Sequence, residues 1–252
     1  MKVGLISDVH GNWEALNVVL KRLQDEEGVD EVFCGGDIVG YGPEPNKCVS
    51  ELGSASPISV KGNHDAGLVG ELQLDFFNRA GLAALKWTKD EITKQNRAFL
   101  EQLPQKRFLS RERISLLHGS SVNPLTHYIT RKVDAYRSFQ RSEEEFDLQI
   151  FGHTHLPVVY EIAGEDVEEY RIQGSQSFSF EPNKKYLINP GSVGQPRDGN
   201  WKTSFAVLDL TGDMFPEQVT FYRREYPAEE TRQKIIDAEL PSELGNRLLH
   251  GR

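Results

Sequence analysis

The 252-residue sequence has few cysteines and no long apolar run. Its two cysteines, Cys34 and Cys48, are too few for a disulfide framework and suit a reducing compartment. No stretch is apolar over the length that crosses a bilayer, and the short apolar run at the N-terminus lacks the length and cleavage site of a signal peptide. We therefore expect a cytoplasmic protein that does not bind membranes.

The sequence also lacks an excess of positive charge. It contains 29 Lys and Arg residues against 38 Asp and Glu residues, which gives a formal net charge of -9 at pH 7. Non-specific nucleic-acid binding needs a basic surface, so we do not expect it here. A small anionic substrate is compatible with this charge, because bound metal ions can reverse the local sign.

The first part of the chain contains five short apolar runs, and each ends in a cluster of polar residues. The runs have the length and composition of strands and span residues 2–7, 31–34, 57–61, 113–117 and 147–151. Helical patterns lie between the early runs and again over residues 75–103. A strand–helix–strand order predicts a partly parallel sheet with helices on its faces.

The second half of the chain has a different pattern, with apolar runs joined by short turns. These runs span residues 158–162, 169–173, 185–189, 203–210 and 219–223. They predict a second, mostly antiparallel sheet that packs on the first. No Pro-, Gly- or Ser-rich linker separates the halves, so we expect a single domain over residues 1–252. Residues 227–252 predict a C-terminal helical extension, whose apolar side chains either dock on this chain or contact a partner.

The polar clusters after the five strands have the composition of a metal site. Ligands of open α/β sheets bind beyond the carboxyl ends of the strands, where these clusters lie. Their carboxylate, amide and imidazole groups suit Mn, Fe, Zn or Ni better than Ca or Mg. The candidate ligands are Asp8, His10, Asp37, Asn63, His118, His153 and His155. Side chains two apart on a strand share a face, so we expect strand alternation to aim Asp8 with His10, and His153 with His155, at the same spot. The alternative is that these polar residues only stabilise turns.

Together these motifs resemble the calcineurin-like metallophosphoesterase superfamily. The motifs are Asp8-x-His10, Gly36-Asp37-x-x-Gly40, Gly62-Asn63-His64-Asp65, His118 and Gly152-His153-x-His155. The resemblance implies an α/β (α+β) fold, a four-layer αββα sandwich of two packed mixed β-sheets flanked by helices. The segments 39–43 and 189–199 further resemble a small bacterial and archaeal branch of phosphodiesterases and relatives of diadenosine tetraphosphate hydrolases.

The resemblance also implies a division of the ligands between two divalent metal ions, with Mn the leading candidate. The first ion would be held by Asp8, His10 and His155, and the second by Asn63, His118 and His153. Asp37 would bridge the two ions, since its carboxylate can offer one oxygen to each. His64 would contact the phosphate and protonate the leaving group, and Asp65 would orient the His64 ring.

We therefore expect a hydrolase that cleaves phosphodiester or phosphomonoester bonds with metal-bound hydroxide. Its partner would be a small phosphorylated substrate, and the chain could form a homo-oligomer. Arg197 is either a phosphate-binding fork or a solvated arginine. Tyr41 either stacks on the substrate or covers the core. The alternative functions are a protein serine/threonine phosphatase and a non-catalytic metal-binding scaffold.

Overall fold

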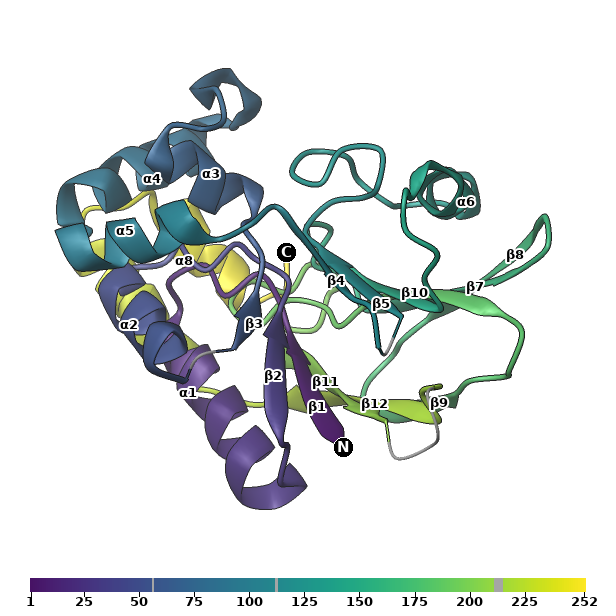
Figure 1. Cartoon of the computed structure of the whole chain (residues 1–252). Coiled ribbons are helices and arrows are strands. Elements are labelled where there is room, and N and C mark those ends of the chain that lie inside the picture. Colours follow the sequence, from purple (N-terminus) through teal and green to yellow (C-terminus); the bar gives the residue numbers. More distant parts are fainter. Residues whose placement is uncertain (56, 112, 211–214) are drawn as a thin grey trace.

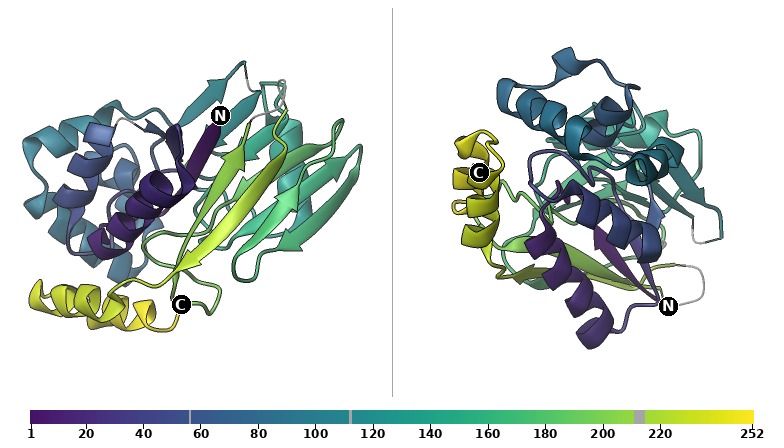
Figure 2. Two further views of the ribbon diagram at one scale, coloured as in Figure 1. Left: turned by 90° about the horizontal axis from the view of Figure 1, so that it is seen from below. Right: turned by 90° about the vertical axis from the view of Figure 1, so that its left-hand side faces the viewer.

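Two six-stranded β-sheets pack against each other in the computed structural model, which describes residues 1–55, 57–111, 113–210 and 215–252. Figures 1 and 2 show helices on the outer sides of this pair of sheets. The α/β fold with two mixed sheets that the motifs implied is thus confirmed.

The first sheet has the strand order β3-β2-β1-β11-β12-β9. Its strands are β1 (Lys2–Ile6), β2 (Glu31–Cys34), β3 (Ile58–Ser59), β9 (Gln176–Ser179), β11 (Thr203–Asp209) and β12 (Gln218–Arg224). The strands β1, β2 and β3 are parallel, whereas β11 pairs antiparallel with β1.

The second sheet has the strand order β4-β5-β6-β10-β7-β8. Its strands are β4 (Lys106–Leu109), β5 (Ile114–Leu117), β6 (Leu148–Ile150), β7 (Val158–Ala163), β8 (Asp166–Arg171) and β10 (Lys185–Asn189). The neighbours β5, β6 and β10 are parallel, and the remaining pairs are antiparallel.

The prediction that the second half forms a sheet of its own is wrong. The strands β11, β12 and β9 extend the first sheet from β1, while β10, β7 and β8 extend the second from β6. Apolar patterning predicts that a strand exists and which face it buries, but it does not record which edge the strand joins. Two strands, β4 and β9, were not expected. The edge strand β8 begins three residues before the predicted 169–173, because its charged and exposed residues give no apolar signal.

The helices join the parallel strands and form the outer layers. They are α1 (Trp13–Lys21), continued by the π-helical turn η1 (Arg22–Glu27), α2 (Pro45–Ala55), α3 (Asn63–Val69), the 3-10 turn η2 (Leu74–Phe76), α4 (Arg79–Glu91), α5 (Lys94–Gln102), α6 (Lys132–Arg141), α7 (Ala228–Asp237) and α8 (Ser242–Leu248). No described helix is long and apolar enough to cross a membrane. The side chain of Asn12 caps α1 by accepting a hydrogen bond from Ala15 N.

Alternate side chains of β1 point to opposite faces of the first sheet and so pack into two different apolar clusters. Val3 and Leu5 point between the two sheets, where they pack with Ile150 and other residues of the second sheet. Ile6 points the other way and packs with Leu16 beneath the helices. The sheets are therefore fixed relative to each other, and so are the loops at their strand ends.

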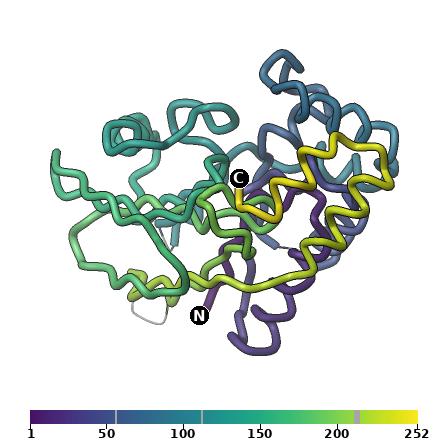
Figure 3. The backbone as a smooth tube through the Cα atoms, turned by 180° about the vertical axis from the view of Figure 1, so that it is seen from behind, coloured from purple at the N-terminus to yellow at the C-terminus, as the bar shows by residue number. Residues whose placement is uncertain are grey.

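The C-terminal helices dock on this chain. Figure 3 shows α7 and α8 in yellow alongside the purple and blue helices of the N-terminal part. Ile235 and Leu240 are buried there, whereas Ile236 is exposed. The hydroxyl of Thr231 donates a hydrogen bond to Asn12 Oδ1, which connects α7 to the residue that caps α1.

Candidate metal centre

All seven candidate ligands converge at one place, between the carboxyl ends of β1, β2 and β3 in one sheet and those of β5 and β6 in the other. Asn63 is half-buried, and the other six side chains are at most 5% exposed. Each comes from a loop or helix start directly after a strand. The two packed sheets thus bring together residues that lie up to 147 positions apart in the sequence, such as Asp8 and His155.

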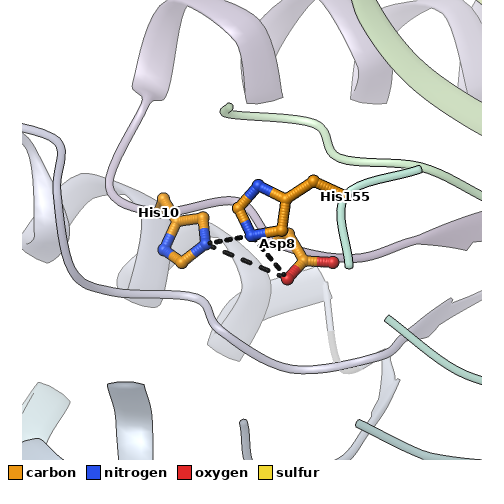
Figure 4. Close-up of side chains that lie close together, drawn as sticks. All are labelled: Asp8, His10 and His155. Atoms are coloured by element: carbon orange, nitrogen blue, oxygen red, sulfur yellow. Dashed lines mark hydrogen bonds and ion pairs between the residues drawn. The ribbon is translucent and has the colours of Figure 1, made fainter. Parts of the chain in front are cut away.

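The first group consists of Asp8, His10 and His155 (Figure 4). Nε2 of His155 lies 3.2 Å from Oδ1 of Asp8 and 3.1 Å from Nε2 of His10. The other ring nitrogens face backbone carbonyls, with His10 Nδ1 3.2 Å from Val39 O and His155 Nδ1 2.5 Å from Gln195 O. Each Nδ1 therefore carries a proton to donate, which leaves the Nε2 lone pairs pointing at each other and at a carboxylate.

The second group consists of Asp37, Asn63, His118 and His153. Nε2 of His118 lies 3.0 Å from Asn63 Oδ1, 3.1 Å from His153 Nδ1 and 3.3 Å from Asp37 Oδ2. His118 Nδ1 donates to Gly35 O at 2.8 Å, which turns Nε2 toward the group. Burial opposes ionisation of this ring, but Asp37 raises the pKa of His118 to about 9, so Nε2 carries a proton that a bound cation would displace.

Asp37 connects the two groups. Its Oδ2 lies 3.7 Å from His10 Nε2 and 3.3 Å from His118 Nε2, while its Oδ1 accepts a hydrogen bond from His64 N at 2.8 Å. We had expected one carboxylate oxygen for each ion. In the structure a single oxygen faces both groups, because the other is held by the first turn of α3.

The chemistry of the donors fits two metal ions. Two neutral imidazoles cannot form a hydrogen bond through nitrogens that both lack a proton, whereas a cation accepts both lone pairs. Burial lowers the pKa of His10 and lowers that of His153 to about 3, so both rings are neutral ligands. Burial alone would raise the pKa of Asp8, but the neighbouring rings of His155 and His118 outweigh it and lower this pKa, so the carboxyl is ionised.

The ligands stand on an unusual backbone. Asp8, His10, Asp37, His153 and His155 all have positive φ, between 50° and 67°. Residues other than glycine rarely adopt this conformation, and such residues cluster at functional sites. The ligand pairs Asp8/His10 and His153/His155 therefore reach the two adjacent groups of the centre through left-handed turns beyond β1 and β6. We had expected them to do so through strand alternation.

His64 lies at the start of α3, beside the metal ligands. Its ring centroid is 4.9 Å from that of His10 and 4.5 Å from that of Tyr41, and the side chain is buried. Burial lowers the pKa of His64 to about 4, although the charge of Asp37 opposes this. The ring is therefore neutral in the free protein, and an anionic substrate beside it would raise its pKa.

The predicted role of Asp65 is wrong. Its Oδ1 accepts hydrogen bonds from Ile38 N at 3.0 Å and Val39 N at 3.2 Å, and its Oδ2 accepts one from Gly62 N at 2.9 Å. Within the described residues, the buried Nδ1 of His64 has no hydrogen-bond partner. Asp65 thus connects two segments of the backbone: the loop after Asp37 and the turn before Asn63. It does not orient the His64 ring.

Tyr41 and Arg197 both lie beside the centre. The buried Tyr41 ring packs against His10 and His64, with centroids 4.6 Å and 4.5 Å apart, so it forms a wall of the site. Nη2 of the half-buried Arg197 donates to Tyr41 OH at 3.4 Å and to Gln195 Oε1 at 3.1 Å. Arg197 also lines a cavity of about 420 Å³, whose wall includes Thr154 from the turn between two metal ligands.

The segment over residues 189–199 also holds the metal loops in place. Ser192 Oγ and Gly194 N both donate to Asp8 O, at 2.8 Å and 2.9 Å, and Asn189 Nδ2 donates to Gly152 O at 2.7 Å. Sequence reasoning missed Tyr128, which stacks on His153 with ring centroids 3.7 Å apart and is 49% exposed. Only its position downstream of His118 in the sequence points toward this contact.

Two packed mixed sheets carry buried imidazoles and carboxylates at their strand ends in groups that could hold metal ions. Comparisons with known proteins place this arrangement in a family. The calcineurin-like phosphoesterase superfamily domain matches residues 1–213. The protein MJ0912 of Methanocaldococcus jannaschii is 36% identical over 255 aligned residues, which cover 99% of this chain and 98% of that protein. The crystal structure of a metallophosphoesterase from Sphaerobacter thermophilus matches with a TM-score of 0.85 and 35% identity, over 100% of this chain and 99% of that one.

A further relative is the phosphodiesterase YfcE of Escherichia coli K12. It is 26% identical over 219 residues, which cover 83% of this chain and 88% of that protein. The chain belongs to the calcineurin-like phosphoesterase superfamily, a class of hydrolases. The resemblance inferred from the motifs is thereby confirmed.

Proposed function

We propose that the chain hydrolyses phosphodiester or phosphomonoester bonds at a centre of two divalent metal ions, with Mn preferred and Fe, Zn or Ni as alternatives. The observation that carries this proposal is the convergence of imidazole, carboxylate and amide lone pairs into two groups that share Asp37 Oδ2. The names of relatives support the reaction class, since one is a phosphodiesterase and another a metallophosphoesterase.

The two groups divide the ligands between the ions. One ion would be held by Asp8, His10 and His155, the other by Asn63, His118 and His153, with Asp37 common to both. When bound there, the ions would polarise a phosphoryl oxygen and lower the pKa of water. The protein holds these ligands rigidly through the backbone carbonyls that fix their imidazole tautomers.

His64 supplies the proton for the leaving group in this proposal. Its Nδ1 lies next to Gly40, where an added Cβ would be only 2.3 Å away, so the opposite side of the ring is the one available to a substrate. A phosphate beside the ring stabilises the protonated imidazole, which then donates to the departing oxygen. The ring takes this proton from solvent when the substrate binds, and it becomes neutral again when it donates the proton.

A small phosphorylated substrate fits better than a protein substrate. The cavity beside Thr154 and Arg197, of about 420 Å³, has room for an organic ester group, and it is lined by apolar residues such as Leu156 and Tyr160. The scaffold alternative predicts metal binding without turnover, and the same assay therefore separates it from the enzyme.

The experiment is a hydrolysis assay of metal-stripped protein given Mn, on bis(p-nitrophenyl) phosphate and p-nitrophenyl phosphate. We expect turnover that requires the metal and that falls by at least about a hundredfold in His64→Ala and Asp37→Asn. Asp90→Asn, an exposed carboxylate on α4, is the matched control and should keep full activity. Absence of turnover with each of Mn, Fe, Zn and Ni, despite two bound ions per chain, would refute the hydrolase and favour the scaffold.

A further inference from the structure

Two arginines from distant parts of the sequence lie against the same buried tyrosine. The Cζ atom of Arg197 is 5.8 Å from the centroid of the Tyr41 ring, and the Cζ atom of Arg247 is 5.4 Å from it. The Tyr41 ring itself contacts His10 and His64. Both guanidinium groups are therefore only one aromatic ring away from the candidate metal centre.

Neither arginine is neutralised within the part of the chain that the structure describes. Among the described residues no carboxylate forms an ion pair with either one; Glu243, one turn before Arg247 in α8, attracts it without forming an ion pair. The enclosed nitrogens Arg197 Nε, Arg247 Nε and Arg247 Nη2 have no hydrogen-bond partner there. Nη2 of Arg197 has the neutral acceptors Tyr41 OH and Gln195 Oε1, but neither guanidinium group has an anionic partner. Enclosed cationic nitrogens without acceptors are unfavourable, and an anion would compensate for them.

The fold holds Arg247 firmly in this position. Leu244 and Leu248 on α8 are buried in one apolar cluster with Tyr41, Ala80 and Ala84. Near the end of the chain, Gly251 O accepts a hydrogen bond from Gly199 N, in the loop that carries Arg197. The C-terminal extension thus connects directly to the Arg197 loop.

Arg247 lies outside the part of the chain that the superfamily domain matches, which ends at residue 213. The metal ligands and His64 all lie inside it. The C-terminal helices therefore add a positive charge to a centre whose other groups belong to the shared domain, in a chain whose net charge is -9.

We propose that Arg197 and Arg247 form a second anion-binding subsite, which accepts a phosphate adjacent to the scissile one. The substrate class is then an ester with two or more linked phosphates. This inference rests on the proposed function for the position of the scissile phosphate. Guanidinium groups bind phosphate with paired, charge-assisted hydrogen bonds. Arg197 also lines the cavity that includes Thr154, so a substrate that extends into this cavity meets Arg197 there.

The test compares two substrates that differ by one charged phosphate. They are bis(p-nitrophenyl) phosphate and P1,P2-bis(p-nitrophenyl) pyrophosphate, with hydrolysis followed by phosphorus NMR. Arg247→Gln should lower kcat/KM for the pyrophosphate diester by about tenfold or more and leave the simple diester nearly unchanged. Arg247→Lys should recover part of the loss, and Arg137→Gln, an exposed arginine on α6, should change neither substrate.

A binding measurement makes the result independent of turnover. Calorimetry of the pyrophosphate diester with His64→Ala, alone and combined with Arg247→Gln, should show weaker binding in the double variant. If wild-type protein hydrolyses neither diester but the double variant binds more weakly, the proposed function fails and the subsite stands. Equal loss for both substrates would mean that Arg247 binds the scissile phosphate or only stabilises the fold, and either result overturns the inference.

Discussion

A methyl group added at Gly40 should disable His64 without disturbing the metal ligands. Gly40 has a φ of +91°, and a Cβ built there would lie 2.3 Å from His64 Nδ1, about 1 Å inside ordinary contact. The backbone alone should cost about 1–2 kcal/mol of the free energy of unfolding, because an alanine tolerates this conformation poorly. The clash must in addition push the imidazole out of place.

The matched control is Gly174→Ala. Gly174 also has a positive φ, +78°, but nothing lies within 4 Å of its added Cβ. Both variants should therefore lose similar stability in chemical denaturation. Only Gly40→Ala should lose activity, by about a hundredfold in kcat, since a displacement of about 1 Å at a reacting group has that effect. Metal content should remain two ions per chain in both.

The assay is the Mn-dependent hydrolysis of bis(p-nitrophenyl) phosphate, read beside urea denaturation and metal content. The reasoning fails if Gly40→Ala is as active as Gly174→Ala, since His64 would then have no catalytic role. It also fails if Gly40→Ala loses its metal, since the effect would then lie in the ligands.

Three further results are expected. Asp65→Ala should lower the free energy of unfolding by about 3 kcal/mol, because it leaves three buried backbone N–H groups without an acceptor. Unchanged stability with reduced activity would instead indicate that Asp65 orients His64. Leu244→Ala should cost about 2–5 kcal/mol, whereas Ile236→Ala on the exposed side of α7 should cost under about 0.5 kcal/mol; similar effects in urea denaturation would contradict the docking of α8. Adding Mn to metal-stripped protein at a hundredfold of its Kd should raise stability by about 2.7 kcal/mol for each site, and an unchanged Tm would count against metal binding.

The site could be predicted from the sequence because its signals are local. Each ligand follows directly after a strand. The short motifs around Asp37 and His153 can therefore be found even when the strand order of the sheets is predicted wrongly. The division of strands between the sheets could not be predicted, because pairing β11 with β1 depends on contacts across about 200 residues. Short patterns carry no such information.

Side-chain roles were less predictable than side-chain positions. Asp65 follows His64 directly, but its carboxylate turns toward the backbone of the Asp37 loop, a choice that depends on how the two loops meet. Arg247 offered no signal at all, since a charged C-terminal segment is most simply a solvated surface. Its place beside Tyr41 becomes visible only once α8 is docked.

Anomalous X-ray diffraction from crystals grown with Mn tests whether two ions share Asp37. We expect two anomalous peaks per chain, one enclosed by Asp8, His10 and His155 and the other by Asn63, His118 and His153, with Asp37 Oδ2 in contact with both. One peak only, or two peaks that do not both contact Asp37, would contradict it.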